Sequence, residues 1–580
     1  MKAKHIAIAV FIMLMSVSAF GQDLEHIAKQ KPFHVSGGVG AGYTHMFTND
    51  SSGVPMPSFW NVNLNLNFSI YGVSIPLSAM ITNGKFDLVN SFNQFGLSPK
   101  YKWITLHAGY RQYNYSPYSV SGQTFLGGGF ELRPWIIRLG FFAGRLRKAA
   151  KVDTTQYSQT IPGSYPLNVS SNGGHNYYSQ AGGFTRWGWG LKIGIGKENN
   201  YVDLILFKGQ DRTRSITDSF SQVSLKPEQN LVIGLNTFQK LGKHLTFGFD
   251  AAASVYTYNT NMDSIVMDED IPLKNFFALL TPINMTSQLQ TAGSVNLGLN
   301  FKNFRMATQY RRIDPYYRSM GITSTYSDVE LVSTQITWSI LKQKIRFSHM
   351  LQFQHDNLNH YKQLTSDRLM INATVSLNLK TKWGIDVNYN NFGMWQIKSN
   401  QLVSDSLKVY QKSNTITLIP RYIILTQNYT DVISLVASYT DINGGSVIQS
   451  STNHVNNIYT TLNNTLVINK SGWAINSGLN YNAAKTSFNT LTSFGLIAGV
   501  SKSFFKNTLS LSNSNTVLWN VLDGKGNGNT IGIDLTAGYT LLKKHNFGCG
   551  FNYMYSPANG IYNKSDVSQL RCMVTYQYNF

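Results

Sequence analysis

Apolar and polar residues alternate along almost the whole chain, in segments of about ten residues. In 185–195, tryptophan, leucine and isoleucine alternate with arginine, lysine and glycine, and 367–379, 528–539 and 570–580 repeat the pattern. Successive side chains of a β-strand point to opposite faces, whereas a helix would repeat every 3.6 residues or so. The chain is therefore predicted to be all-β, with strands that are apolar on one face and polar on the other.

Composition indicates where such strands could fold. Charged residues make up 13% of the chain and aromatic residues another 13%, whereas soluble domains carry roughly 25% charged residues. Beyond the N-terminal region no stretch approaches the run of about 18 apolar residues that a spanning helix needs. Polar, uncharged and aromatic-rich strands fit a transmembrane β-barrel better than a soluble enzyme.

The N-terminal region predicts export. Residues 1–21 combine Lys2 and Lys4, an apolar stretch and a small-residue cleavage site, so we interpret them as a signal peptide. Removing those two lysines from the formal charge of +21 leaves a mature protein of about +19. We assign 22–32 to a short periplasmic segment and 33–580 to one barrel. So short a segment leaves no room for the plug domain of a TonB-dependent transporter or for the repeats of an assembly translocase, so we expect loops or another protein to fill the lumen.

Connections of two lengths separate the strands. Short turns, many of them basic, and longer connections rich in serine, threonine, asparagine and glycine are typical of periplasmic turns and external loops. The short turns are 196–200, 240–244, 301–304, 341–344, 380–383, 469–473, 504–507 and 542–546. The long connections include 148–182, 211–228, 259–286 and 397–411. Our count is about 26 antiparallel strands, in the range 22–26, with both ends on the periplasmic side.

The chain ends on an alternating strand whose apolar face carries Tyr576, Tyr578 and Phe580. Pairing of this strand with the first one would close the barrel and remove both edges. The aromatic ending resembles the assembly signal of bacterial outer-membrane proteins, and the Phe-Gly-Gln at the cleavage site resembles a style common in Bacteroidota. The resemblance implies location in the outer membrane, and handling by the barrel-assembly machinery during biogenesis.

Basic residues on the polar faces are the main functional candidates. The register places eight of them toward the lumen: Arg111, Arg138, Arg186, Lys192, Arg305, Arg311, Arg346 and Arg368. The opposite register would expose each charge to lipid, at a cost of about 2–4 kcal/mol near the midplane. After about residue 400 the predicted lumen wall is mainly neutral, with Arg421 an exception. Such an arc would favour anions, or it would hold a lumen-filling loop through that loop's carboxylates.

The connection 259–286 differs from the others because acidic residues precede an apolar stretch. Ile271, Phe276, Phe277, Leu279 and Leu280 form that stretch. It could pack on the barrel rim, cap the lumen or bind a partner. The acidic residues match no defined calcium loop, so we predict no metal site.

Other motifs give little support for catalysis. The glycines of 37–42 and 126–130 do not open a helix after a strand, which argues against a nucleotide or any other cofactor. His107, Glu131 and Asp203 fall on neighbouring strands without a nucleophile beside a base. We therefore predict that the protein is not an enzyme. Cys549 and Cys572 should lie about opposite each other, either bridged or as small apolar residues facing lipid.

Two classes of function remain. The first is a porin-like conduit for anionic or polar solutes, including acidic glycans. The second is a plugged accessory barrel that binds a lipoprotein or a component of secretion machinery. An outer-membrane enzyme is a distant third. The partners we expect are membrane lipid and lipopolysaccharide, whose phosphates the basic segments 145–151 and 210–214 could neutralise; nothing indicates nucleic acid.

Overall fold

The computed structural model contains one antiparallel β-sheet of 27 strands. It describes residues 33–49, 57–70, 73–83, 94–149, 183–216, 225–265, 280–323, 326–378, 382–399, 408–446, 453–558 and 565–580. The segments assigned above to a signal peptide and a periplasmic N-terminus lie outside these residues. Among the helices within them, none has the length and apolar character needed to cross a membrane.

The strands follow one another with few other elements between them. The first part of the sheet comprises β1 (Phe33–Thr48), β2 (Ser58–Ile70), β3 (Val73–Thr82), β4 (Gln94–Leu97), β5 (Lys100–Tyr101), β6 (Ile104–Gln112), β7 (Thr124–Leu132), β8 (Ile137–Arg147) and β9 (Thr185–Lys197). Next come β10 (Asn200–Arg212), β11 (Gln229–Leu241), β12 (Leu245–Thr257), β13 (Ser287–Asn300), β14 (Phe304–Ile313), β15 (Val329–Ile340), β16 (Ile345–His355), β17 (Leu364–Leu377) and β18 (Trp383–Lys398). The last part comprises β19 (Val409–Leu425), β20 (Tyr429–Ser446), β21 (Asn453–Ile468), β22 (Trp473–Lys485), β23 (Thr490–Phe504), β24 (Leu509–Leu522), β25 (Lys525–Leu541), β26 (His545–Ser556) and β27 (Val567–Asn579).

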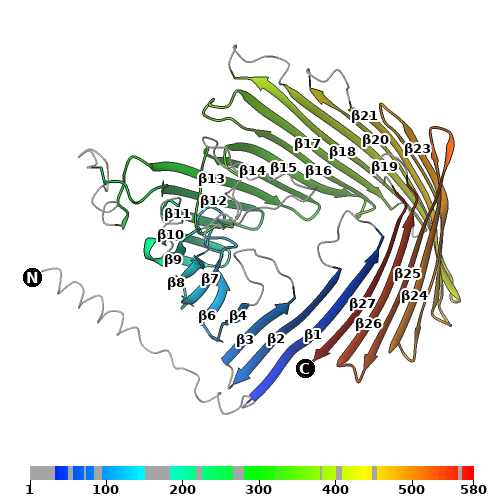
Figure 1. Cartoon of the computed structure of the whole chain (residues 1–580), viewed down its shortest axis with the longest axis horizontal. Coiled ribbons are helices and arrows are strands. Elements are labelled where there is room, and N and C mark those ends of the chain that lie inside the picture. The colour runs from blue at the N-terminus through cyan, green and yellow to red at the C-terminus, as the bar shows by residue number, and fades with distance from the viewer. Residues whose placement is uncertain are drawn as a thin grey trace, which may run out of the picture.

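The sheet closes on itself. Apart from β4 and β5, each strand pairs with its sequence neighbours, and β27 pairs with β1, so that red β27 lies beside blue β1 in Figure 1. β4 and β5 both lie between β3 and β6, which turns the 27 strands into a ring of 26 positions. At the closing pair, the Phe580 amide donates to the Gly37 carbonyl at 2.9 Å. The predicted all-β antiparallel barrel is therefore confirmed.

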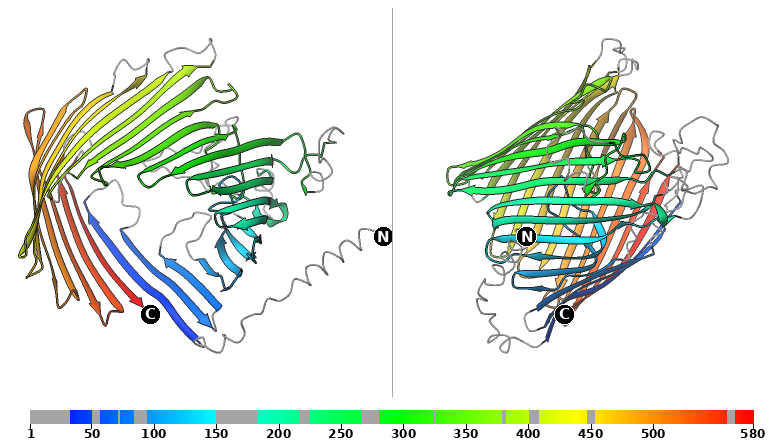
Figure 2. Two further views of the ribbon diagram at one scale, coloured as in Figure 1. Left: turned by 180° about the vertical axis from the view of Figure 1, so that it is seen from behind. Right: turned by 90° about the vertical axis from the view of Figure 1, so that its left-hand side faces the viewer.

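Two belts of exposed aromatic side chains surround the outer face of the wall, whose strands run obliquely in Figure 2. One belt lies toward the long connections and includes Tyr43, Phe47, Trp60, Trp187, Tyr310, Phe353, Trp395, Tyr481 and Phe494. The other lies at the short turns and includes Phe33, Trp338, Trp383, Tyr429, Trp473, Tyr539 and Phe547. Exposed aliphatic residues lie between them, among them Ile193, Leu204, Leu297, Leu351, Leu418, Leu479, Leu496 and Val574. An apolar band between two aromatic girdles is the surface of a barrel that spans a lipid bilayer.

The predicted difference between turns and loops follows the same axis. The short turns named above lie at the end of the barrel where Phe580 meets Gly37, and the longer connections lie at the other end, together with the two-residue turn of Asp523 and Gly524. Several short turns carry lysine at their tips, including Lys197, Lys243, Lys302, Lys342, Lys470, Lys506 and Lys543. We refer to these two ends as the short-turn end and the long-loop end.

The two cysteines are both free. Their predicted register is two residues out: Cys549 lies opposite Val574, and Cys572 lies opposite Phe551. The exposed neighbours Phe547, Phe551 and Val574 show that both thiols belong to the outer face. They therefore act as small apolar groups, which is one of the two alternatives that the sequence left open.

Candidate functional site in the barrel lumen

The structure directs all eight basic residues named above to the inner face. In β9, Arg186 and Lys192 alternate with Trp187 and Ile193, which are 39% and 51% exposed on the outside, while Lys192 is only 5% exposed. Cross-strand pairing carries the same assignment from strand to strand around the wall. What these charges can do depends on what lies beside each of them.

Two connections at the long-loop end fold back into the lumen. We call them the inner loops: residues 113–122 belong to the connection between β6 and β7, and residues 314–322 belong to the connection between β14 and β15. Their buried residues are Tyr113, Tyr115, Ser116, Tyr118, Ser119, Val120, Tyr317, Ser319 and Met320, each 8% exposed or less. We call the part of the wall from β6 to β15 that they cover the filled arc.

Aromatic packing joins the first inner loop to the wall. The ring of Tyr113 stacks on Phe142 of β8 with 4.8 Å between centroids, and Phe125 and Phe207 extend the cluster. The inner face of β10 is buried along its length, so that Ile205 and Phe207 have no exposed surface. A barrel interior is usually polar, and these apolar side chains would face water if the inner loops were absent.

Hydrogen bonds connect the two inner loops to each other. The Tyr317 hydroxyl donates to the Tyr118 carbonyl at 2.5 Å, and the Ser319 hydroxyl donates to the Ser119 carbonyl at 2.7 Å. The second loop is also anchored to the wall, because Asn230 of β11 accepts a bond from the Met320 amide at 3.0 Å. Since Asn230 is fully buried, this contact is shielded from water. The inner loops therefore form one plug rather than two independent flaps.

Glycines on the wall make room for this plug. A Cβ at Gly209 of β10 would lie 2.9 Å from the Met320 sulfur, and a Cβ at Gly140 of β8 would lie 2.7 Å from the Tyr115 hydroxyl. Real Cβ atoms do not approach side-chain atoms this closely, so any larger residue would push the plug away. The glycine-rich inner face is thus required by the close approach of the loops.

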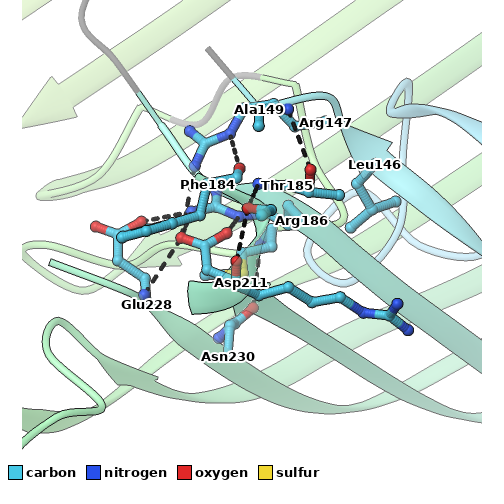
Figure 3. A network of polar contacts seen from close by, with 12 residues as sticks. Leu146, Arg147, Ala149, Phe184, Thr185, Arg186, Asp211, Glu228 and Asn230 are labelled. Carbon is cyan, nitrogen blue, oxygen red and sulfur yellow. Dashed lines mark hydrogen bonds and ion pairs between the residues drawn. The ribbon is translucent and has the colours of Figure 1, made fainter. Parts of the chain in front are cut away.

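A buried ion-pair network lies at the long-loop end of the filled arc, as Figure 3 shows. The Arg186 guanidinium donates from Nε to Asp211 at 2.7 Å and from Nη2 to Glu228 at 2.6 Å. Arg147 approaches the same Asp211 at 3.5 Å, and the Tyr256 hydroxyl donates to Glu228 at 2.8 Å. The Asp211 side chain is 1% exposed, so its charge depends on these partners.

Further along the filled arc the charges are also matched. Arg138 forms a bidentate pair with Asp203 of β10, at 2.7 and 2.8 Å, and lies over the ring of Tyr201. The Lys192 ammonium lies 4.5 Å from the centre of the Tyr115 ring in the first inner loop. We expected the carboxylates of a lumen-filling loop to match the arc. Instead, they come from β10 and from the residue before β11, and the first inner loop supplies the ring of Tyr115.

The remaining basic residues differ in accessibility: Arg305 and Arg346 are exposed, whereas the Nε of Arg311 is buried. Arg111 donates to the Leu97 carbonyl at 3.3 Å, at the break between β4 and β5. Within the described residues, no ion pair forms with Arg305 and Arg311 of β14, Arg346 of β16 or Arg368 of β17. These four arginines lie on β14, β16 and β17, near the end of the filled arc.

The wall from β18 to β27, which we call the bare arc, differs in its inner lining. Its inner faces carry ladders of hydroxyl and amide side chains: Thr417 with Ser438, Thr461 with Asn480, Ser493 with Asn520 and Ser512 with Thr536. Arg421 is matched by Asp386. No residue of β22, β24, β25 or β27 is buried on either face. Since one face meets the surroundings of the barrel, the other must be accessible from the lumen.

The candidate cap connection is described only in part. Ile271, Phe276, Phe277 and Leu279 lie outside the described residues, so a cap over the lumen stays a prediction. Leu280, in contrast, lies on the outer side of the wall, where its carbonyl accepts a hydrogen bond from Lys208 of β10. Two residues further on, the Pro282 carbonyl accepts a hydrogen bond from the Gln229 side chain of β11 at 2.7 Å. Thr281, between Leu280 and Pro282 in the chain, is fully buried. This end of the connection therefore packs on the rim.

Comparisons with known proteins find structural similarity only at low sequence identity. The chain matches no protein-family model and no curated protein sequence. Among solved structures it is similar to the translocation pore of the P pilus usher PapC, with 10% identity and a TM-score of 0.37 over 94% of this chain and 99% of that one. It is also similar to OccK8 (OprE) of Pseudomonas aeruginosa, with 11% identity and a TM-score of 0.30 over 61% of this chain and 93% of that one.

Proposed function

We propose that this protein is an outer-membrane conduit that passes hydrated polar solutes along the bare arc of its lumen. The observation that carries the proposal is the accessibility of the inner faces of β22, β24, β25 and β27, which are lined by hydroxyl and amide groups. Such a wall exchanges hydrogen bonds with water and with sugars or other polar molecules without binding any of them tightly. On the other side of the lumen, along the filled arc, the plug narrows the space open to solutes.

The membrane location is supported by the outer surface. Aliphatic residues between two aromatic belts match a hydrocarbon layer bounded by two interfaces. We propose that the long-loop end faces the lipopolysaccharide leaflet. Arg145 and Arg212 lie on the outer face at that end, and Arg212 lies over the Trp187 ring at 4.4 Å, so both can reach the phosphates of lipopolysaccharide.

We further propose a moderate preference for anions. Arg305, Arg346 and Arg368 bring positive charge to the lumen beside the bare arc, and none of them forms an ion pair within the described residues. Fixed charges of one sign raise the local concentration of ions of the opposite sign. The matched residues Arg138 and Arg186 contribute little to this preference, because their partners cancel their charge.

Purified protein in planar lipid bilayers tests the proposal. We expect steady single-channel currents, reversal potentials that indicate anion preference in a potassium chloride gradient, and uptake of the neutral trisaccharide raffinose by proteoliposomes. Replacing Arg305 and Arg368 together with glutamine should reduce the anion preference. The matched control replaces the exposed turn residues Lys470 and Lys506 with glutamine, which removes the same charge outside the lumen. Bilayers that stay silent with correctly folded protein would instead favour the plugged accessory barrel.

A further inference from the structure

An open pocket at the short-turn end collects positive charge from three elements. It has a volume of about 280 Å³ and is lined by Lys302, Asn303, Phe304, Arg305, Thr337, Trp338, Ser339, Gln343 and Arg346. Three of these side chains are cationic, and Asn303, Thr337, Ser339 and Gln343 offer hydroxyl groups or amides, while Phe304 and Trp338 belong to the outer face. None of the nine lining residues carries a carboxylate.

The strand register explains why the two arginines converge. Arg305 of β14 lies opposite Thr337 of β15, and Arg346 of β16 lies opposite Ser339 on the other side of the same strand. Neighbouring strands are about 4.8 Å apart, and residues two apart along a strand are separated by about 6.8 Å. Both guanidinium groups therefore extend over the same hydroxyl-bearing stretch of β15. Lys302 approaches from the turn between β13 and β14.

No described acidic residue neutralises the pocket. Lys302, Arg305 and Arg346 form no ion pair within the described part of the chain. On the side of β17 and β18, the first acidic residue in line with Arg346 is Asp386. Ser376 of β17 lies opposite Arg346, and Asp386 of β18 lies opposite Ser376. Asp386 is already held by Arg421. The pocket therefore keeps its positive charge, unlike the network around Asp211.

We propose that this pocket binds the anionic group of a solute, of the phosphate or carboxylate class, where the conduit opens at the short-turn end. The inference rests on the proposed conduit and adds a specific docking point to it. Arginine forks suit the paired oxygens of such groups, and a lysine adds a mobile charge. The hydroxyls of Thr337 and Ser339 can donate to the remaining oxygens. The occupant we infer belongs to the solute rather than to a lipid headgroup, because Arg305 and Arg346 lie on the inner face.

Inorganic pyrophosphate is a suitable probe. In bilayers made of phosphatidylcholine alone, pyrophosphate added at the short-turn side should reduce the potassium chloride current in a concentration-dependent way. Replacing Lys302 and Arg346 with glutamine should raise the half-blocking concentration about tenfold or more, since each charge-assisted bond lost weakens binding. The control variant carries Lys470→Gln and Lys506→Gln, which remove the same charge from other short turns. Pyrophosphate should block its current at the same concentration as in the wild type.

Three outcomes would overturn the proposal. One is equal block of the wild type and the Lys302/Arg346 variant. The second is block that is stronger from the long-loop side. The third is a block by pyrophosphate that weakens in proportion to the fraction of anionic phosphatidylglycerol in the bilayer. That result would assign the pocket to lipid headgroups.

A binding measurement separates this proposal from the conduit itself. If the bilayers stay silent, equilibrium dialysis of pyrophosphate against the detergent-solubilised barrel still reports on the pocket. Binding that is lost in the Lys302/Arg346 variant and kept in the Lys470/Lys506 control would support the pocket while the conduit failed. Conduction without binding would refute the pocket alone.

Discussion

The filled arc and the bare arc are built from the same kind of strand, yet their inner faces differ. On β10 every second residue is buried, with Ile205 and Phe207 fully inaccessible. On β22 and β25 no residue is buried on either face. The outer faces of both arcs are apolar, as the lipid requires. The inner face is free to vary, because it faces whatever the chain places in the lumen.

The difference teaches that charge on a barrel wall has two distinct uses. In the filled arc, Arg138 and Arg186 are largely covered and are paired with the buried Asp203 and Asp211, so they fix the wall in one arrangement. On β14–β17, Arg305, Arg346 and Arg368 have no described ion-pair partner and lie toward accessible space. A cation-rich strand therefore cannot be interpreted from its sequence alone: the burial and the partners of each charge decide whether it holds structure or attracts solutes.

The largest difference between the arcs should appear when matched arginines are removed. Arg186→Ala would remove the main partner of the buried Asp211, leaving only the longer contact with Arg147 at 3.5 Å, at a cost of about 3 kcal/mol of unfolding free energy. Arg421→Ala removes a partly exposed pair on the bare arc and should cost about 1 kcal/mol or less. Urea unfolding in lipid vesicles, followed by tryptophan fluorescence, measures both. Similar losses in the two variants would contradict the distinction between buried and accessible charge.

A steric test of the plug should give an intermediate effect. Gly209→Leu would force a side chain into the space of Met320, displacing the second inner loop at a cost of about 1–3 kcal/mol. The comparison variant is Gly532→Leu on the bare arc, where the nearest atom to a new Cβ is Thr516 Cβ at 3.8 Å. Trypsin cleavage after Arg318 should increase in the first variant only. If both variants resist trypsin equally, the plug is not held against β10 as described.

The smallest effect concerns the long-loop end where the filled arc stops. Asp328 forms an ion pair with Lys362 and accepts a hydrogen bond from the Leu358 amide at 2.8 Å. Burial opposes ionisation of this carboxyl, but the Lys362 ammonium and the amide hold its pKa below the usual value. A lowered pKa stabilises the folded loop above the unfolded value of about 3.9, and this stabilisation is lost as the pH falls through the folded pKa.

We therefore expect Asp328→Asn to destabilise the 356–362 connection by about 1 kcal/mol at neutral pH, because Lys362 is half exposed and its charge is screened. Hydrogen exchange of the amides in that connection measures the effect, and the wild type and the variant should converge in acid. Asp441→Asn, at an exposed pair with His454 on the bare arc, is the control. A difference between wild type and Asp328→Asn that persists at low pH would contradict the ionic origin.

Much of the wall could be predicted because its physics is local. The alternation of apolar and polar residues divides each strand into two faces, and the apolar face must meet the lipid. The strand segments, the pairing of β27 with β1 and the inward direction of residues such as Arg186 therefore follow from the sequence. The plug could not be predicted in the same way. Residues 113–122 and 314–322 resemble ordinary polar connections apart from their tyrosines, and their burial depends on each other and on Phe142 and Asn230, which are distant in sequence. The clustered tyrosines in a connection, with glycines on the facing strands, are the signal that could have indicated it.

The closing pair of β1 and β27 has a consequence for the rate of folding. At the long-loop end of this pair, the Asn49 amide Nδ2 donates to the Asp566 carbonyl at 3.1 Å across 517 residues of chain. Every other wall contact can form as a hairpin between near neighbours, whereas this one must wait until the two most distant strands meet. Ring closure should therefore be the slow step. Until it is complete, β1 and β27 are two open edges that any second copy of the chain could pair with, so dilution or an assembly factor that covers β1 should favour the monomeric barrel over aggregates.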